Sequence, residues 1–281
     1  MEIFKHIAPL KAFLKDKQKH GKSVGLVPTM GALHSGHLAL VQASRQQNQL
    51  TVSSIYVNPT QFNNPADLEK YPRTFEKDIA MLGEAGCDAV FYPDNAEMYQ
   101  QTSLVKFDFG HLDKVMEGQF RPGHFSGVAL VVSKLFHIVS PDHAYFGQKD
   151  FQQFAIIRQL VTELKFDISL HCIPTLRESD GLAMSSRNLR LTSEERNRAI
   201  VFYKALLLAK QKLTEGSSVS ETKALVRKMV DKETKTSLEY IELADSINLN
   251  TLDNVSDGNR PILCIAGYVG EVRLIDNMYL D

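Results

Sequence analysis

Val27-Pro-Thr-Met-Gly-Ala-Leu-His-Ser-Gly-His37 is the most informative segment of the sequence. Residues 23–27 predict a strand, the glycine that follows predicts a turn, and a helical apolar period begins near Gly36. His34 and His37 therefore fall at a helix start, where unpaired N–H groups and the positive dipole end favour anions. The stretch predicts an anion site at a strand end, the alternative being a glycine turn with two surface histidines.

Predicted strands and helices continue to alternate through the first 175 residues. Short apolar runs predict strands over 24–27, 51–57, 89–92 and 143–146, and helical periods predict helices over 38–49, 74–85, 128–139 and 151–164. This order is typical of an α/β fold with a Rossmann-like, doubly wound parallel sheet, whose ligands bind at the carboxyl ends of the strands. The polar clusters after 27, 57 and 146 lie at such ends.

The order of the predicted elements changes near residue 175. A loop-like segment over 177–188 precedes two predicted helices, 193–214 and 220–234, and Thr192 with Glu195 predicts a capping box at the first of them. Three predicted strands follow over 238–243, 261–268 and 272–278. We therefore expect two domains, residues 1–175 and a small α+β C-terminal domain of residues 176–281.

Composition narrows the class of protein. The net charge of −1 gives no basic field for nucleic acid or anionic lipid, and lysines between residues 11 and 22 alternate with apolar residues, as on a solvated helix face. Cys87, Cys172 and Cys264 are far apart, which argues against a zinc site or a disulfide framework and fits a reducing cytoplasm. No apolar run is long enough to span a bilayer, and we expect a cytoplasmic protein without nucleic-acid or membrane partners.

Two further clusters carry phosphate-binding chemistry. Tyr145-Phe-Gly-Gln-Lys-Asp150 again combines a strand end, a glycine and a helix start, with Lys149 placed to reach phosphate. Met184-Ser-Ser-Arg187 offers two hydroxyls and a guanidinium on a loop of mobile character, suited to closing over a pyrophosphate leaving group. Taken singly, the first is equally typical of a capped helix with a surface lysine, and the second of a polar linker.

The flanking motifs resemble those of the pantothenate synthetase (pantoate–β-alanine ligase) family, within the class I synthetase and nucleotidylyltransferase superfamily. The resemblance runs from about residue 24 to 190 and rests on Pro28-Thr-Met-Gly-Ala-Leu-His-Ser-Gly-His37, Val57-Asn-Pro-Thr-Gln-Phe62, Tyr71-Pro-Arg-Thr74, Arg121-Pro-Gly-His-Phe-Ser-Gly127, Phe146-Gly-Gln-Lys-Asp150 and Asp180-Gly-Leu-Ala-Met-Ser-Ser-Arg-Asn188.

The resemblance implies a carbon–nitrogen ligase of pantothenate and coenzyme A biosynthesis. It would condense (R)-pantoate with β-alanine using ATP, releasing AMP and diphosphate through a pantoyl-adenylate, with Mg²⁺ and as a homodimer. The implied catalytic residues are His37, His34 and Lys149. The implied ATP-binding residues are Met30, Gly31, Ala32, Leu33, His34, Ser35, Gly36, His37, Gly147, Gln148, Lys149, Asp150, Leu176, Met184, Ser185, Ser186 and Arg187. No metal ligand is assigned.

The acid substrate needs neutral amides and an apolar wall. Gln61 and Gln153 match the family's pantoate-binding positions, and Pro28, Met30, Val131 and Phe146 would face the gem-dimethyl group. His37 is the expected proton donor, because it sits at the helix mouth and the intrinsic pKa of histidine is near neutral.

Three further charged or titratable residues lie in the flanking motifs or beside them. Asp67 would order the entrance or the metal, or act only as an exposed cap. Arg121 and His124 fall in a predicted Pro-Gly loop that would approach β-alanine.

Three other classes of protein compete with this interpretation. A dinucleotide-forming adenylyltransferase would need basic residues where Gln61 and Gln153 stand. A tRNA-charging synthetase would need a larger and more basic C-terminal region. A non-catalytic nucleotide-binding protein would have no need of three phosphate loops, and ATP–pyrophosphate exchange would distinguish it from an enzyme.

Overall fold

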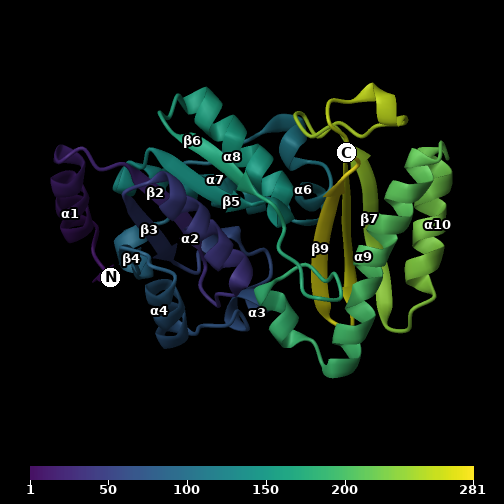
Figure 1. The fold of residues 1–281 in the computed structure, drawn as a ribbon, viewed down its shortest axis with the longest axis horizontal. Coiled ribbons are helices and arrows are strands. Elements are labelled where there is room, and N and C mark those ends of the chain that lie inside the picture. Colours follow the sequence, from purple (N-terminus) through teal and green to yellow (C-terminus); the bar gives the residue numbers. More distant parts are fainter.

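Two β-sheets organise the chain in the computed structural model, which describes residues 1–281 (Figure 1). Six parallel strands form the larger sheet: β1 (Glu2–Phe4), β2 (Val24–Thr29), β3 (Leu50–Ile55), β4 (Ala89–Phe91), β5 (His143–Gly147) and β6 (Ser169–Ile173). Their order is β1-β4-β3-β2-β5-β6, so the chain winds one way from β2 to β4 and the other way through β5 and β6. The predicted doubly wound parallel sheet is confirmed, and its switch point lies between β2 and β5.

Helices cover both faces of this sheet. Leu10 of α1 (Ile7–Lys19), Val128 of α7 (His124–Val139) and Ile157 of α8 (Phe151–Leu164) belong to the buried cluster on one face. Leu40 of α2 (Ser35–Gln47) and Leu82 of α4 (Phe75–Glu84) belong to the cluster on the other. The short helices α3 (Pro65–Glu69), α5 (Asn95–Met98) and α6 (Glu117–Phe120) lie in the connections.

The smaller sheet is antiparallel. It consists of β7 (Thr236–Ala244), β8 (Ile262–Val269) and β9 (Val272–Tyr279), with β8 in the middle. One face packs against α9 (Ser193–Thr214) and α10 (Val219–Asp231), while the other shares a buried cluster with α8 through Phe151 and Ala155 (Figure 1). The two sheets are therefore joined by an apolar contact at the start of α8. The predicted domain boundary at 175/176 falls in the connection after β6 and stays a prediction.

Several sequence predictions hold closely. The bounds of α8 and α9 are those expected, and the Thr192 side chain accepts from the N–H of Glu195, whose carboxylate accepts from the N–H of Thr192, as in the predicted capping box. Other bounds differ by one to three residues at most ends, where helices fray and strands lose pairing. No helix in the structure combines the length and apolar character needed to cross a membrane.

The sequence did not predict two strands, the short helices α3, α5 and α6, or the start of α7. β1 and β6 were missed, because a three-residue strand carries no period and Ser169–Ile173 mixes serine and histidine with its apolar residues. α7 begins at His124, four residues before the predicted 128, because Gly123 adopts a left-handed φ of 81° and turns the chain directly into the helix. His124 therefore lies in a helical first turn rather than in a loop.

Candidate active site

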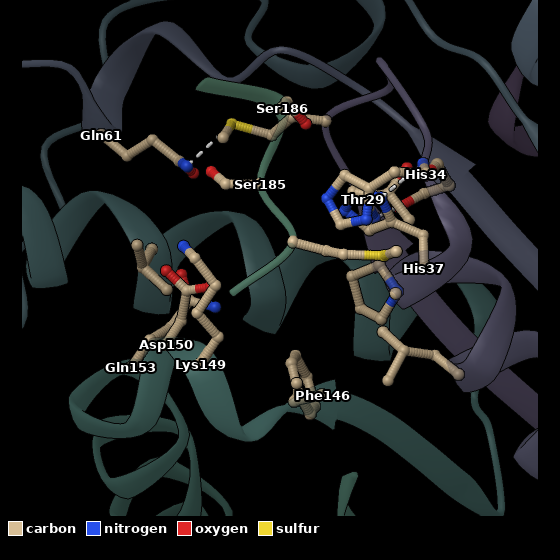
Figure 2. A pocket seen from close by; sticks show the side chains of 18 of the residues that line it. Thr29, His34, His37, Gln61, Phe146, Lys149, Asp150, Gln153, Ser185 and Ser186 are labelled. Atoms are coloured by element: carbon tan, nitrogen blue, oxygen red, sulfur yellow. Dashed lines mark hydrogen bonds between the residues drawn. The ribbon is translucent and has the colours of Figure 1, made fainter. Parts of the chain in front are cut away.

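A cavity of about 210 Å³ opens at the carboxyl ends of β2 and β5, at the switch point of the large sheet. Figure 2 shows His34 and His37 on one side of it, facing Lys149, Asp150 and Gln153 on the other. The segment that carries Ser185 and Ser186 passes between these two groups. Three segments that are distant in sequence therefore converge on one space.

The turn after β2 is held from outside the cavity. Gly31 and Ala32 both have left-handed φ angles, 77° and 50°. The N–H groups of Ala32 and Leu33 donate to the two carboxylate oxygens of Asp78 on α4, at 2.9 and 2.8 Å. These amides are thus already paired within the protein and are not free to bind an anion.

His34 and His37 form a pair at the start of α2. Their ring centroids lie 4.0 Å apart, and the main-chain N–H of His34 donates to Nδ1 of His37 at 3.3 Å. Because Nδ1 of a neutral His37 is then the acceptor, its proton lies on Nε2, which is free to donate. Nδ1 of His34 is buried and has no partner within the protein. This ring nitrogen lies against the first turn of α2, 3.0 Å from the position that a Cβ on Gly36 would take, and is shielded from the cavity.

The electrostatic state of the two imidazoles differs from the sequence expectation. Burial, followed by the nearby Lys149, lowers the pKa of His34 to about 4. Burial lowers the pKa of His37 well below its ordinary value as well, with contributions from His34 and Lys149. Burial in the unliganded protein thus shifts His37 away from the near-neutral intrinsic pKa of histidine, and both rings are neutral near pH 7 and act as hydrogen-bonding groups.

Lys149 is carried by a single 3-10 turn, Gln148–Asp150, between β5 and α8. Asn277 of β9 fastens this turn, since its side chain donates to the carbonyls of Gln148 and Lys149 and accepts from the Gln148 amide. The side chain of Lys149 lines the cavity. A cation in this position complements a polyphosphate.

The segment 184–187 lies against both sides of the cavity entrance. The hydroxyl of Ser186 donates to the carbonyl of Ala32 at 2.9 Å. Asp67 accepts from Arg187 at 3.3 Å and from Arg190 at 2.7 Å. Burial alone would raise the pKa of Asp67, but the two guanidiniums lower it overall. Of the roles considered for Asp67, the structure fits ordering of the entrance.

Gln61 and Gln153 reach the same cavity from different elements. Gln61 follows β3 and is buried, and its Oε1 accepts from Asn58 at 3.1 Å, which directs its amide nitrogen toward Met30 and the cavity (Figure 2). Gln153 lies in the first turn of α8. Pro28, Met30, Val131 and Phe146 form an apolar wall nearby.

A smaller cavity of about 30 Å³ adjoins this space beside Lys149, Asp150 and Gln153. Arg121 and His124 line it. Nδ1 of His124 is hydrogen-bonded to the carbonyl of Gln61 at 2.8 Å, and burial with the nearby Arg121 lowers its pKa to about 3, so His124 is a neutral support for the Gln61 backbone. Burial lowers the pKa of Arg121 to about 10, still a cation at neutral pH.

Most of the expected site residues lie together. The large cavity is lined by Pro28, Met30, His34, Gly36, His37, Gln61, Val131, Phe146, Gly147, Lys149, Asp150, Gln153, Leu176, Met184, Ser185, Ser186 and Arg187. Outside its lining are Gly31, Ala32, Leu33, Ser35 and Gln148. Three of these form the turn held by Asp78, and the Gln148 side chain is directed to Asn277.

The sequence interpretation missed other lining residues: Thr29, Leu40, Ser54, Tyr56, Asn58, Tyr71, Val128, Val132, Leu135, Pro174 and Thr175. Asn58 and Tyr71 stand inside the motifs that carried the family resemblance, so a signal existed for them. The apolar residues of α7 gave none, because a helix face that lines a cavity has the same period as one that lines a core.

No group of three histidine, cysteine, aspartate or glutamate side chains is arranged to hold a metal ion. Asp150 is the carboxylate that lines the large cavity, and it is exposed. This arrangement fits Mg²⁺ that arrives on a nucleotide, since Mg²⁺ retains water and takes one or two carboxylates along with substrate phosphates.

Comparisons with known proteins agree with the site. Residues 2–279 match a family model described as pantoate-beta-alanine ligase. The pantothenate synthetase of Cytophaga hutchinsonii is 46% identical over 275 residues, covering 98% of this chain and 97% of its own. That of Caldicellulosiruptor bescii is 45% identical over 282 residues, covering 100% and 99%.

Solved structures give the same result. The pantothenate synthetase of Thermus thermophilus superposes with a TM-score of 0.93 at 40% identity, covering 100% of this chain and 99% of that one. The pantoate-beta-alanine ligase of Francisella tularensis, described as complexed with beta-gamma ATP and beta-alanine, gives a TM-score of 0.83 at 34% identity, with coverage of 100% and 98%.

Proposed function

This chain belongs to the pantoate-beta-alanine ligase family, and from that premise we propose how its own residues carry out the reaction. The enzyme forms pantothenate from pantoate and β-alanine in an ATP-dependent reaction. The observation that carries the residue assignment is the convergence of His34, His37 and Lys149 on one cavity with the two amides Gln61 and Gln153.

We propose that the reaction proceeds in two steps. A carboxylate oxygen of pantoate attacks the α-phosphorus of ATP, and the bond to the departing diphosphate breaks, giving pantoyl-adenylate. The amine of β-alanine then attacks the acyl carbon, loses a proton, and displaces AMP. Carboxylate is a weak nucleophile, so holding it in line with the α-phosphorus supplies much of the rate.

The phosphate side of the cavity would stabilise the developing charge. Nε2–H of His37, the ammonium of Lys149 and the hydroxyl of Ser185 are donors that the protein holds in place before the reaction. Bound polyphosphate would raise the pKa of both imidazoles, because an anion beside them favours their protonated form.

We also propose that Mg²⁺ enters with ATP and is held by Asp150 together with the phosphates. When bound, the ion would supply charge neutralisation at the phosphate oxygens. Loss of activity in excess EDTA and its return with Mg²⁺ would test this; full activity in EDTA would contradict it.

The adenine is assigned to the cavity edge formed by Leu176. The carbonyl of Leu176 already accepts from the N–H of Met184 at 3.0 Å, so its contact with the base would come from the N–H. The acid side is assigned to Gln61, whose Oε1 accepts from Asn58 and whose NH₂ donates one hydrogen to Sδ of Met30 and keeps the other for pantoate.

Arg121 supports an assignment of the smaller cavity to the β-alanine carboxylate. Its nearest carboxylate, Glu117, lies 3.8 Å away and is occupied by two bonds from Arg273, at 2.7 and 2.8 Å. The Arg121 guanidinium therefore keeps donors for a substrate. Arg121→Met should raise the KM for β-alanine at least about ten-fold with that for pantoate unchanged; the reverse pattern would contradict the assignment.

The homodimeric state implied by the family resemblance and the cytoplasmic location expected from the composition are part of this proposal. Sedimentation velocity at micromolar concentration tests the first, with a monomeric mass as the contrary result. Cell fractionation tests the second.

The experiment that tests the function is isotope exchange between pyrophosphate and ATP. Exchange should require pantoate and proceed without β-alanine, because the adenylate forms before the amine is used. Exchange without any acid would indicate a different adenylyltransferase, and exchange that begins only with β-alanine would indicate a concerted route.

A further inference from the structure

Asp78 is a buried carboxylate outside the lining of the large cavity, and no basic side chain pairs with it. It lies in the first turn of α4, where only 1% of the residue is exposed, and it forms no ion pair with a lysine, arginine or histidine. Its acceptors are filled by the N–H of Ala32, the N–H of Leu33 and the hydroxyl of Thr74, at 2.9, 2.8 and 3.1 Å. A charge buried at this depth is retained only where hydrogen bonds stabilise it.

The backbone that Asp78 binds has an unusual conformation. Gly31 and Ala32 are both left-handed, and a Cβ on Gly31 would lie 3.0 Å from a carboxylate oxygen of Asp78. Successive N–H groups in such a turn form a concave site for an anion. Here a carboxylate of the protein occupies that site, and its hydrogen bonds offset the strain of the left-handed alanine.

The carbonyl side of Ala32 faces the cavity entrance. While the N–H of Ala32 points to Asp78, its carbonyl accepts from the hydroxyl of Ser186 at 2.9 Å. His34, the N-cap of α2, follows directly after Leu33. The orientation of the turn therefore sets where the segment 184–187 docks and where the histidine pair begins.

We propose that Asp78 is a positioning residue that presents the carbonyl of Ala32 to Ser186 and holds His34 and His37 in register with the phosphates. The inference rests on the roles assigned to those residues above. Asp78 touches no substrate: it acts through the backbone of the turn, so its effect should appear in the alignment of the reacting groups.

Asp78→Asn is the isosteric test. Asparagine keeps one acceptor oxygen but turns an NH₂ group toward one of the two turn amides, which leaves a buried donor unpaired and releases the turn. Asp245→Asn is the matched control, because Asp245 is also buried and accepts from three backbone N–H groups, those of Ile247, Asn248 and Asn259, but in the β7–β8 connection.

The two variants should lose similar thermal stability but differ in kinetics. Pantoate-dependent exchange by Asp78→Asn should fall roughly 10- to 100-fold in kcat, the scale of an ångström-sized misplacement of reacting groups, while Asp245→Asn keeps wild-type constants. Unchanged kcat and KM in a destabilised Asp78→Asn would overturn the inference and leave a purely structural carboxylate.

A double-mutant cycle of Asp78→Asn with Ser186→Ala tests whether Asp78 acts through the carbonyl of Ala32. If Asp78 acts through Ala32, the double variant should be little worse than the more damaged single variant. Fully additive losses would overturn the proposed connection. If Asp78→Asn does not fold, Thr74→Val removes one of the three bonds to Asp78, and its kcat should fall by a smaller factor in the same direction. Wild-type kinetics in a folded Thr74→Val would then count against the inference.

Failure of the proposed function would be distinct from failure here. If the proposed function is wrong, the unmodified enzyme will show no pantoate-dependent exchange. If only the inference about Asp78 is wrong, the unmodified enzyme will be active and the Asp78 variants will have unchanged kinetics.

Discussion

The side-chain amide of Asn277 donates to the main-chain carbonyl of Lys149 at 2.9 Å. Asn277 lies on β9 of the small sheet, and Lys149 lies in the turn after β5 of the large one. Asn277 is 3% exposed, so this bond is shielded from water. The C-terminal unit thus fixes the backbone of the lysine that we assign to the phosphates.

Removing this hydrogen bond should raise the KM for ATP more than the KM for pantoate. Asn277→Ala leaves the carbonyls of Gln148 and Lys149 without their donor, so the turn should shift and the KM for ATP should rise about ten-fold, the equivalent of about 1.4 kcal/mol. Initial-rate kinetics with each substrate varied provide the measurement. The exposed Asn259→Ala is the control. An equal rise in both KM values would indicate general loosening of the fold instead.

The phosphate donors should be needed for the chemical step. His37→Ala and Lys149→Ala should each slow adenylate formation by roughly 10²- to 10³-fold, the scale for removing a preorganised donor to developing charge. Single-turnover measurement of pantoyl-adenylate checks this, with Lys77→Ala on the exposed side of α4 as the control. Wild-type rates in either variant would show that the side chain does not contact the reacting phosphates.

The side-chain amides of Gln61 and Gln153 should determine how tightly the enzyme binds pantoate. Gln61→Ala and Gln153→Ala should raise the KM for pantoate at least about ten-fold while that for ATP changes little, because a site built to bond a hydroxyl discriminates against its loss. An analogue of pantoate without the 2-hydroxyl should be a poor substrate for the unmodified enzyme. Gln159→Ala, on the same helix as Gln153 and hydrogen-bonded to Glu163, is the control. Lost ATP binding with normal pantoate binding would reverse the assignment of the pocket.

The buried histidines predict acid sensitivity of the fold. The pKa of His34 is lowered to about 4 and that of His124 to about 3, both from an unfolded value of 6.5. Between pH 6.5 and 4 the unfolded chain therefore binds more protons than the folded one, so stability is full above pH 6.5 and falls as the solution is acidified. Each such histidine adds up to about 1.4 kcal/mol per pH unit to the slope of the free energy of unfolding against pH.

Urea unfolding at several pH values measures that slope. His124→Asn should reduce the slope between about pH 6 and 4 by about one histidine's contribution, whatever its effect on absolute stability, and the exposed His137→Asn is the control. A slope identical to that of the unmodified enzyme would show that His124 is protonated in the folded state.

Local patterns in the sequence were enough to predict the alternation of strands and helices, the capping box at Thr192 and the three clusters that we assign to phosphate. These features depend on local chemistry: apolar period, glycine and proline in turns, and side-chain caps are all set within about ten residues. The rule that parallel strands present ligands at their carboxyl ends then sufficed to place Thr29–His37 and Gly147–Asp150 at one edge of the sheet.

How each group is held and charged depends on contacts between distant parts of the chain. Asp78 and Asn277 support the site from α4 and β9, and neither has a local pattern that distinguishes it from other polar residues. The lowered pKa values of His34 and His37 arise from burial and from a lysine distant in the sequence, and the near-neutral intrinsic pKa of histidine does not reveal them. Burial and the field of distant charges belong to the packed chain, and the sequence around a residue does not contain them.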